Sequence, residues 1–525
     1  MRYSNRTIFK KMGYLPIFVS ILLLVLQSCG TQQSLPVTES SDEISFKFIQ
    51  LNDVYEIAPL GGGLYGGLAR VAHIRDSVVN VNPNTYMFMA GDFLNPSLLG
   101  TLKVDGERVN GKHMVEVMNA MNFDLVTFGN HEFDVGEKAL QNRLNESNFI
   151  WTSANVKQIT SKGKEVFMVK NDIGNIPIKE TYILTIEDKE GDRVKVGFFS
   201  VTTPTNPVEF VAYGDVILEG VRAYNELIDK VDFVVGFTHL SLEEDKALAN
   251  KLPDLQLIMG GHEHYGMLVP VNNTIIAKAD ANAKTIYIHT LTYNKKTKNL
   301  KIDSHLMPVD DKISSSPKVK ALVDKWNDIL DKNIKEVISD PNEIVFHAKP
   351  PLDGTDSANR GIQTNLGDIF TAAMATSFNI PAQAAIVNGG SFRLDDMLDG
   401  DISSLDVFRV LPFGGKVVKV KLKGSLLIEV LEYGKSKSGT GAYLQRHNIK
   451  ESDIAGWMIN SKPIRINDEY TIAMSDFLMK GYDIPFLKAD NPGIIEVYEP
   501  IPSEAAFDVR KAVINYMKSL KPIKK

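Results

Sequence analysis

Cysteine is almost absent from this chain. Its 525 residues contain one, Cys29, so the remainder can form neither an intrachain disulfide nor a thiolate metal site. Any bound metal ion must therefore be held by nitrogen and oxygen ligands from His, Asp, Asn or Tyr side chains.

The chain also lacks an excess of positive charge, internal repeats and low-complexity tracts. Its net charge of -6 gives no electrostatic reason to expect a nucleic acid polymer as partner. Apolar residues make up 44% and charged residues 23% of the chain, as in ordinary globular proteins. The chain is longer than a single domain with one hydrophobic core usually is, so two or three domains are expected.

No apolar run is long enough for an ordinary membrane span. The longest, Leu15 to Leu26, follows a basic segment containing Arg2, Arg6, Lys10 and Lys11. Such a basic segment followed by a short apolar run is typical of a signal peptide.

The apolar run ends at Leu26-Gln27-Ser28-Cys29, which resembles a bacterial lipobox. We therefore predict a lipoprotein signal peptide over 1–29, cleaved before Cys29, with lipid on Cys29 and a polar tether over 30–43. The protein would be exported and held by this lipid alone on a bacterial membrane, at the periplasmic or the cell-surface face. The alternative is an ordinary signal peptide with an incidental cysteine.

From Ile44 to about Pro308, short apolar runs alternate with helical patterns. Continuous apolar runs are typical of strands buried on both faces, which predicts a layered α/β domain over 44–312. Ligands in such sheets bind beyond the strand ends, and here each run ends abruptly in polar residues. The five runs are YMFMAGD (86–92), FDLVTFGNHE (123–132), VKVGFFSV (194–201), FVVGFTH (233–239) and LQLIMGGHEH (255–264).

Two further segments follow this domain. Residues 313–342 are predicted to contain a linker helix, because apolar residues recur on one stripe. From 343 to 521 a second, smaller α/β domain is expected, with a helix after Thr364 and strands at AAIVNGG and KVVKVKL. The predicted stripe of the linker helix consists of Val319, Leu322, Trp326, Ile329 and Leu330.

Polar metal-binding residue types gather at five predicted strand ends. The order along the chain is Asp53/Tyr55, GD (91–92), GNHE (129–132), His239 and GGHEH (260–264). A two-metal site needs a bridging carboxylate between cations about 3.5 to 4 Å apart, and Asp92 is the natural bridge. One ion would take Asp53, Asp92 and His264.

The second ion would take Asp92 together with Asn130, His239 and His262. Carboxylate, amide and imidazole ligands fit Zn, Mn, Fe or Co, as two divalent ions or a mixed-valence pair. Such a pair would polarise a shared water into hydroxide at neutral pH. His131, directed at the substrate, could stabilise phosphoryl charge or protonate the leaving oxygen. Asp134 could orient its imidazole.

This set of motifs resembles the calcineurin-like metallophosphoesterases, and GNHEFD (129–134) resembles their 5′-nucleotidase branch. GGLAR (66–70) and SANV (153–156) are similar to other segments of that branch. In the second domain, RGIQTNLGD (360–368), NGGSFR (388–393), LPFGG (411–415) and SDFLMKGYD (475–483) resemble the family's substrate domain. The resemblance covers nearly all of the mature chain.

The resemblance implies a four-layer αββα domain followed by a substrate-binding domain. It also implies hydrolysis of nucleotides or related phosphate esters in a cleft between them, with hinge rotation moving the substrate. Carried over by motif, Arg360, Asn388 and Arg393 would hold the substrate's anionic groups. Phe413 and Phe477 would sandwich a base.

The substrate loops depart from the family pattern. Asp483 would accept a hydrogen bond from a ribose hydroxyl, but Tyr482 and Ile484 stand beside it where the family has glycines. Ser391 and Phe392 likewise add bulk to a loop that is glycine-rich in the family. Glycine permits close backbone approach and positive φ, so we expect these loops to have a different local shape.

Tyr55 is a third departure, because the family has histidine there. One interpretation is that Tyr55 packs nearby or faces the substrate, while water completes the first ion's shell. A second is that it ligates a hard trivalent ion, as tyrosine ligates ferric iron in the similar purple acid phosphatases. A third is that the first site is lost. Tyr55 is left out of the predicted ligand set.

The predicted function is a metal-dependent phosphohydrolase that releases phosphate from nucleotides or related esters outside the cytoplasm. The alternative substrates are cyclic nucleotides, UDP-sugars or other phosphate esters. An alternative of another class is a lipoprotein that binds nucleotides or a partner with little catalysis. No oligomeric state is predicted.

Overall fold

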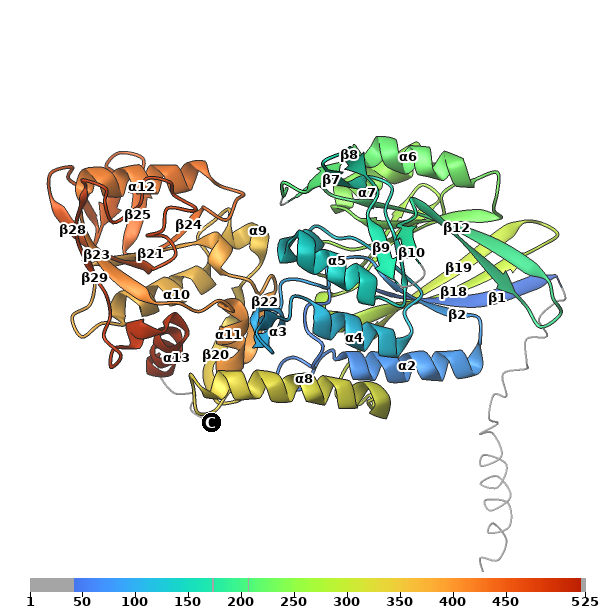
Figure 1. Cartoon of the computed structure of the whole chain (residues 1–525), viewed down its shortest axis with the longest axis horizontal. Coiled ribbons are helices and arrows are strands. Elements are labelled where there is room, and N and C mark those ends of the chain that lie inside the picture. The colour runs from blue at the N-terminus through green and yellow to red at the C-terminus, as the bar shows by residue number, and fades with distance from the viewer. Residues whose placement is uncertain (1–41, 172–173, 206, 521–525) are drawn as a thin grey trace, which may run out of the picture. The chain divides into compact units, whose positions relative to one another are not determined.

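A computed structural model describes residues 42–171, 174–205 and 207–520 (Figure 1). The chain from Ile44 onward forms one compact unit. The predicted signal peptide, the lipid site at Cys29 and most of the tether lie outside the described residues. Within the described ranges, the helices are all too short or too polar to cross a membrane.

The first large sheet has the strand order β19-β18-β1-β2-β5-β6. The pairs β1–β2, β2–β5 and β5–β6 are parallel, whereas β18 and β19 form an antiparallel pair at one edge. The strands are β1 (Glu43–Leu51), β2 (Thr85–Met89), β5 (Leu125–Thr127), β6 (Ile150–Thr152), β18 (Thr285–Asn294) and β19 (Asn299–Pro308).

The second large sheet has the order β11-β12-β14-β15-β17-β16. Its central pairs β12–β14, β14–β15 and β15–β17 are parallel, so their carboxyl ends meet at one edge. The strands are β11 (Thr181–Glu187), β12 (Arg193–Thr202), β14 (Phe233–His239), β15 (Leu257–Gly260), β16 (Met267–Val271) and β17 (Thr274–Lys278).

The two sheets pack face to face around an aromatic core, and helices cover their outer faces. Phe48 and Phe88 of the first sheet contact Phe198 of the second, Phe88 also contacts Phe237, and Phe46 stacks on Phe233. Figure 1 shows α6 and α7 on one outer face and α2, α4 and α8 on the other. The predicted four-layer αββα arrangement is therefore confirmed.

Local capping explains where several of these helices begin. Ser241 and Glu244 form a capping box at the start of α7, and Asp215 accepts from two backbone N–H groups at the start of α6, as helix N-termini require. The helices are α2 (Leu68–Val81), α3 (Leu98–Thr101), α4 (Lys112–Met121), α5 (Glu137–Glu146), α6 (Val216–Leu227) and α7 (Leu242–Lys251).

A 19-residue helix, α8 (Pro317–Lys335), lies within the segment predicted as a linker and packs against α2 and α4. Val319, Trp326 and Leu330 are buried as the stripe predicts, together with Val323 and Ile334. Leu322 and Ile329 are only partly buried, because the contact stripe runs slightly to one side of them. The boundaries at 312 and 342 remain predictions.

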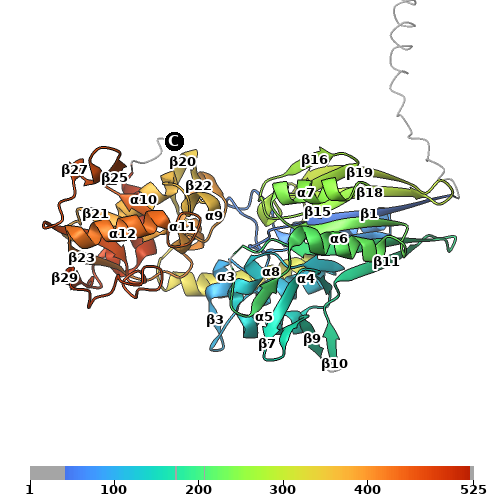
Figure 2. The ribbon, with the colours of Figure 1, turned by 90° about the horizontal axis from the view of Figure 1, so that it is seen from above.

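The C-terminal part contains a five-stranded mixed sheet of order β24-β21-β28-β23-β29. Figure 2 shows α10 and α12 beside these strands, and α13 packs on α10. Its elements are β20 (Ile344–Asp353), α9 (Asp356–Asn359), α10 (Asn365–Thr376), β21 (Ala384–Asn388), β22 (Met397–Ser403), α11 (Ser404–Val410), β23 (Val417–Lys423), α12 (Gly424–Ser436), β24 (Leu444–His447), β28 (Glu469–Ser475), β29 (Ile494–Tyr498) and α13 (Val509–Ser519).

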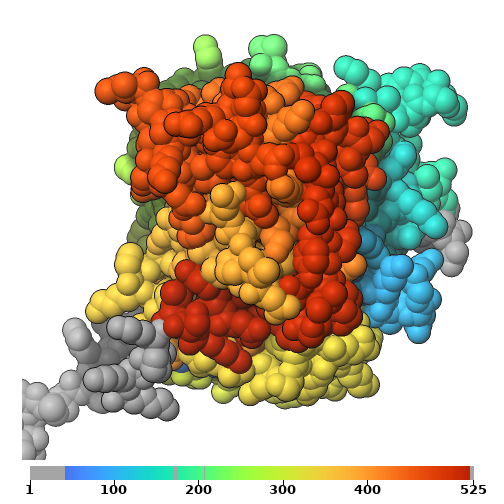
Figure 3. All heavy atoms as spheres, turned by 90° about the vertical axis from the view of Figure 1, so that its left-hand side faces the viewer, coloured from blue at the N-terminus to red at the C-terminus, as the bar shows by residue number. Residues whose placement is uncertain are grey.

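Short elements complete the fold. Figure 3 shows the face of the C-terminal part on which α13 and the residues just before it, in red, reach the surface. The short strands are β3 (Lys103–Val104), β4 (Glu107–Arg108), β7 (Val156–Thr160), β8 (Gly163–Glu165), β9 (Met168–Asn171), β10 (Gly174–Pro177), β13 (Val211–Tyr213), β25 (Ile449–Ser452), β26 (Gly456–Ile459) and β27 (Lys462–Pro463). The 3₁₀ helices are η1 (His131–Val135), η2 (Ala281–Ala283), η3 (Gly389–Ser391) and η4 (Ala505–Phe507).

Candidate active site

The predicted metal ligands all follow or end parallel strands. Asp53 comes after β1, Asp92 after β2 and Asn130 after β5, while His239 ends β14. His262 and His264 lie in the loop after β15. Since carboxyl ends of neighbouring parallel strands lie at one sheet edge, residues far apart in the sequence come together here.

Glycines make this close approach possible. A Cβ on Gly129 would lie 2.1 Å from Asp92 Oδ1, and one on Gly261 would lie 2.4 Å from the carbonyl oxygen of Ala90. Gly91 adopts φ +80°, a conformation that side chains disfavour. The glycines beside the ligand residues are therefore required by space as well as by backbone conformation.

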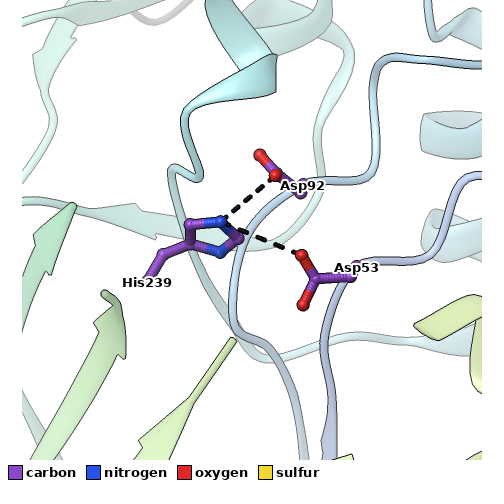
Figure 4. Close-up of side chains that lie close together, drawn as sticks. All are labelled: Asp53, Asp92 and His239. Carbon is purple, nitrogen blue, oxygen red and sulfur yellow. Dashed lines mark ion pairs between the residues drawn. The ribbon is translucent and has the colours of Figure 1, made fainter. Parts of the chain in front are cut away.

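His239 lies at the centre of the cluster (Figure 4). Its Nε2 is 3.1 Å from Asp92 Oδ2, 3.8 Å from Asp53 Oδ1 and 3.2 Å from Asn130 Oδ1. His264 Nε2 lies 3.2 Å from Asp53 Oδ1. Two atoms that each bind one metal ion at about 2.0–2.2 Å lie about 3 Å or slightly more from each other. The separations in this cluster are of that size.

The electrostatics of the cluster suit bound cations. Asp53 Oδ1 is buried and accepts no hydrogen bond from any residue of the described ranges. Burial lowers the pKa of His239, but Asp92 and Asp53 outweigh it and raise that pKa to about 9. Without an ion, His239 therefore carries an additional proton beside the carboxylates. So does His264, because burial lowers its pKa but Asp395 and Asp53 outweigh this effect and raise that pKa well above its usual value. The donor set therefore fits metal ions, which would replace these protons.

His262 differs from its neighbours in charge. Burial and the neighbouring His239 lower its pKa to about 4, which keeps the ring neutral, the form that binds metals. Its ring centroid is 5.3 Å from that of His239, and its backbone N–H donates to Asp53 Oδ2 over 2.9 Å. The structure thus places His262 beside the cluster, on the side of His239.

A second layer of contacts orients the ligands. The Nδ1 of His239 lies 2.8 Å from the carbonyl oxygen of Ala90, which as the acceptor orients the ring so that Nε2 faces the carboxylates. The Nδ1 of His264 lies 2.6 Å from the carbonyl oxygen of Asp395. The buried Glu132 accepts from the backbone N–H groups of Asp92, Phe93, Leu94 and Gly129.

Tyr55 points into the cluster. Its Oη lies 3.0 Å from His264 Nε2 and 3.4 Å from Asp92 Oδ2, and the residue is 3% exposed. Burial, followed by Asp92 and Asp53, raises the pKa of this phenol well above its usual value in the absence of a cation. The side chain therefore does not face the substrate cavity described below.

His131 connects the cluster to the cavity. Its backbone N–H donates to Asp92 Oδ1 over 2.8 Å, and its Nδ1 lies 2.8 Å from Asp134 Oδ2, the contact expected from the sequence. Burial lowers the pKa of His131, but Asp92, Asp134 and Asp356 outweigh it and raise it to about 10. A charged imidazole is suited to stabilising phosphoryl charge or donating a proton.

One cavity of about 650 Å³ collects the residues predicted to bind substrate, and Asp134 also lines it. The two phenylalanines are substantially exposed, 56% for Phe413 and 37% for Phe477, as a stacking surface requires. The predicted residues that line the cavity are Arg360, Asn388, Arg393, Phe413, Phe477 and Asp483.

Within the cavity, polar groups already contact one another. Asn388 donates to Asp483 over 2.7 Å, and Arg360 Nη2 lies 2.6 Å from Asp356 Oδ2. The guanidinium of Arg393 lies 5.6 Å from the centre of the Phe413 ring. Cationic and aromatic surfaces thus lie side by side, as binding of an anionic, base-containing ligand would require.

The expectation about loop bulk is wrong for Phe392. Its side chain is 1% exposed and packs edge-on against Phe370, so it fills the core rather than the anion site. Ser391 does face the cavity and donates to Asn388 Oδ1 over 2.6 Å. Ile484 is fully buried, whereas Tyr482 is exposed and lies 5.6 Å, between ring centres, from Phe477.

Sequence reasoning missed two aspartates near the cluster. Asp356 Oδ2 lies 3.9 Å from His131 Nε2, and Asp395 Oδ2 lies 3.3 Å from His264 Nε2. Asp356 precedes Arg360 by four residues and Asp395 follows Arg393 by two, so their nearness to predicted substrate residues was the available signal. Glu132 stood inside the GNHE motif without an assigned role.

Comparison with known proteins agrees with this geometry. Residues 46–266 match the model of the calcineurin-like phosphoesterases, and residues 344–489 match that of the 5′-nucleotidase C-terminal domain. The chain belongs to the 5′-nucleotidase family of calcineurin-like metallophosphoesterases. It is therefore a metal-dependent phosphoesterase, as the strand-end motifs predict.

Relatives within the 5′-nucleotidase family are distant in sequence. The 5′-nucleotidase of Bos taurus is 28% identical over 478 residues, covering 80% of this chain and 78% of its own length. The trifunctional nucleotide phosphoesterase protein of Bacillus subtilis is 27% identical over 447 residues, 75% of this chain, but the match spans only 29% of that longer protein.

A solved structure shares the fold. The 5′-nucleotidase precursor from Thermus thermophilus matches with a TM-score of 0.66 at 22% identity, covering 92% of this chain and 97% of its own. The same fold thus extends over the described residues of both family domains.

Proposed function

We propose that this protein hydrolyses phosphate esters of nucleotides and releases inorganic phosphate. One observation carries this proposal: Asp134 lines the cavity and also contacts His131, whose backbone N–H donates to Asp92. The substrate cavity and the predicted metal ligands are thereby joined through two residues, Asp134 and His131. A phosphate bound by Arg360 and Arg393 lies in the cavity that Asp134 reaches.

Different side chains of the protein bind the substrate and assist the reaction. Arg360 and Arg393 hold the anionic groups through charge-assisted hydrogen bonds, and the aromatic faces of Phe413 and Phe477 stack on the base. His131, oriented by Asp134, stabilises developing charge or donates a proton to the leaving oxygen. Two metal ions, held by Asp53, Asp92, Asn130, His239, His262 and His264, supply water activation when bound.

The test measures phosphate release from nucleoside monophosphates, cyclic nucleotides, UDP-sugars and a generic aryl phosphate. Metal-depleted protein receives Mn, Zn, Co or Mg in separate assays. We expect metal-dependent release from at least one nucleotide, with KM raised about 10- to 100-fold in Arg393→Ala, since a charged hydrogen bond is worth about 1.5–3 kcal/mol. Arg193→Ala, which removes an exposed ion pair with Glu187, should leave KM unchanged.

Two outcomes would count against this function. No phosphate release with any metal and any substrate would favour the alternative of a nucleotide- or partner-binding lipoprotein. Release from the aryl phosphate alone, with no change in Arg393→Ala, would remove the nucleotide from the proposal while keeping the phosphoesterase.

We also propose that the protein acts outside the cytoplasm, attached to a bacterial membrane through lipid on Cys29. The support is the basic segment, the short apolar run and the lipobox-like Leu26-Gln27-Ser28-Cys29. Its periplasmic or cell-surface position would give it access to nucleotides that do not cross membranes.

A further inference from the structure

Tyr55 occupies a place that the metal ligands alone do not explain. Its backbone N–H donates to Asn282 Oδ1 over 3.0 Å. Its ring lies 5.5 Å from the ring of His264 and 6.5 Å, edge-on, from the ring of His131. The phenol is therefore fixed from both ends, with its oxygen directed at the first predicted metal site.

The oxygen sits at ligand spacing. Tyr55 Oη is 3.0 Å from His264 Nε2 and 3.4 Å from Asp92 Oδ2, while His264 Nε2 is 3.2 Å from Asp53 Oδ1. Atoms bound to one ion at about 2.0–2.2 Å lie about 3 Å from one another. Tyr55 Oη therefore has the spacing of a fourth member of this set.

The Tyr55 hydroxyl cannot donate a hydrogen bond to His264 Nε2 when that nitrogen binds a metal ion. His264 Nδ1 lies 2.6 Å from the carbonyl oxygen of Asp395, so Nδ1 carries a proton and a metal ion would bind at Nε2. With an ion present, the lone pair of Nε2 is used for the metal and cannot also accept from the Tyr55 hydroxyl. Once an ion occupies Nε2, the hydroxyl loses this acceptor while its oxygen still faces the ion.

We propose that Tyr55 binds the first metal ion as a phenolate and that this site takes ferric iron. This inference rests on the dinuclear centre of the proposed function. Asp53, Asp92 and the phenolate supply three anionic oxygens, and Asp395 Oδ2 lies a further 3.3 Å from His264 Nε2. Hard anionic oxygens favour a hard trivalent cation. The phenolic proton is released to solvent when the ion binds.

The second site has a different character. Its predicted ligands besides the shared Asp92 are the amide of Asn130 and the imidazoles of His239 and His262, which are neutral donors when an ion is bound. Neutral nitrogen and amide donors suit a divalent ion such as Zn. The centre is therefore a ferric–divalent pair, in which Tyr55 directs ferric iron to the first site and leaves the second site to the divalent ion.

The test uses the whole protein, depleted of metal and then supplied with ferric and zinc salts. Phenolate bound to ferric iron absorbs visible light by charge transfer, and excitation into this band enhances the Raman vibrations of the bound tyrosinate. We expect one iron and one zinc per chain with the band present. Tyr55→Phe should lose the band.

Two variants control this result. Tyr213→Phe removes the hydroxyl of another tyrosine, one whose oxygen has no hydrogen-bond partner among the described residues, and should keep the band. Tyr55→His supplies an imidazole instead and should bind two zinc ions without colour. If Tyr55→Phe does not fold, judged by circular dichroism, Tyr55→His carries the test.

Iron bound without a visible band, or a band that persists in Tyr55→Phe or Tyr55→His, would overturn the proposal. Two zinc ions bound in preference to iron, when both are offered, would overturn it as well. Phosphate release is measured in parallel on the same protein supplied with ferric and zinc salts. Activity without the band removes only the role of Tyr55, whereas the band without nucleotide hydrolysis removes only the proposed function.

Discussion

His131 lies between two carboxylates, one on each ring nitrogen. Asp134 is 2.8 Å from Nδ1, and Asp356 is 3.9 Å from Nε2. The first contact fixes the ring orientation, and Asp356 also pairs with Arg360, a predicted substrate residue. Because these groups keep the imidazole charged, its contribution is greatest where negative charge develops on the substrate.

We expect His131→Ala to lower kcat for phosphate release by about 10²- to 10⁴-fold, the usual contribution of a positioned acid or charge stabiliser. KM should change little, because Arg360 and Arg393 remain. Steady-state kinetics on the best substrate measure both values. His305→Ala, at an exposed position on β19, is the matched control, and equal activity in the two variants would refute the role given to His131.

Glu132 organises the loop that carries Asp92. Its two oxygens accept from the backbone N–H groups of Asp92, Phe93, Leu94 and Gly129, over distances of 2.5–3.1 Å. Burial and Asp92 raise the pKa of Glu132 to about 7. The carboxylate thus accepts hydrogen bonds from both loops that flank the predicted bridging ligand.

Glu132→Gln should lower the free energy of unfolding by about 1–3 kcal/mol, because the amide group turns N–H donors toward N–H donors that then lack an acceptor. It should also lower the metal content per chain, since Asp92 loses its support. Denaturant unfolding and metal analysis check the two effects. Glu243→Gln, on the exposed face of α7, should change neither.

At the scale of single residues, the sequence predicted which residues form the site better than it predicted which way their side chains point. Strand-end motifs located Asp92, His131 and His239, because apolar runs end where polar residues begin. They did not place Asp356 or Asp395, whose approach depends on packing of the C-terminal part. Phe392 was misjudged because nothing in the local sequence tells whether a loop side chain turns inward to meet Phe370.

Among the elements, the two large sheets are joined by a buried polar bridge. Gln50 of β1 donates to the carbonyl oxygens of Gly260 and Ala277 in the second sheet. Its remaining oxygen faces His289 Nε2 of β18, and His289 Nδ1 contacts the hydroxyl of Ser304 on β19. His289 must therefore be neutral, with its proton on Nε2 so that Nδ1 accepts from the hydroxyl.

This bridge predicts loss of stability in acid. Burial lowers the pKa of His289 to about 3, below its value of about 6.5 in the unfolded chain. Above pH 6.5 the neutral ring is present in both states and the stability is complete. As the pH falls from about 6.5 toward 3, only the unfolded chain takes up the proton, which costs the native state about 1.4 kcal/mol per pH unit.

His289→Gln tests this slope, because glutamine can donate to Gln50 without titrating. We expect the free energy of unfolding of the variant to fall about 1 kcal/mol less per pH unit between pH 6 and 4 than that of the parent protein. Urea unfolding at several pH values, on metal-free protein, gives the slopes. His305→Gln is the control, and identical slopes in the parent and His289→Gln would contradict the expectation.

At this scale the layered α/β architecture was predictable, since buried parallel strands produce continuous apolar runs. The bridge was not, because Gln50 and His289 lie within strands and look like any polar residue in an otherwise apolar segment. Only the stacking of the two sheets brings Gln50 to the carbonyl groups of β15 and β17. Contacts between the layers of the fold cannot be predicted from local sequence patterns.

For the whole molecule, we expect membrane attachment to depend on the predicted lipid on Cys29 and catalysis to be independent of it. Cys29→Ala should move the protein from the membrane fraction to the soluble exported fraction of an expressing bacterium, because no lipid can then be added. Values of kcat and KM should stay unchanged, since the site is built from residues after Ile44. Fractionation with immunodetection and kinetics on both forms check this, and membrane attachment of the variant would contradict the lipid site.

The C-terminal part contacts the N-terminal part at and around the predicted metal site. The carbonyl of Asp395 contacts the predicted ligand His264, and beside it Lys284 pairs with Asp396 and Arg409 lies 3.7 Å from Glu56. The family resemblance indicated two domains and their order, but no motif indicated that one would complete the surroundings of a metal ligand in the other. Such contacts follow from the tertiary arrangement alone.

The bond between His264 and the Asp395 carbonyl makes metal affinity and chain conformation thermodynamically linked. An ion on Nε2 strengthens the hydrogen bond that Nδ1 donates, so it favours the arrangement in which Asp395 is within reach. By reciprocity, a ligand whose affinity rises when the metal is bound must raise the metal affinity by the same factor. Substrate occupancy can therefore be read out as a higher chelator concentration needed to remove half of the metal at equilibrium.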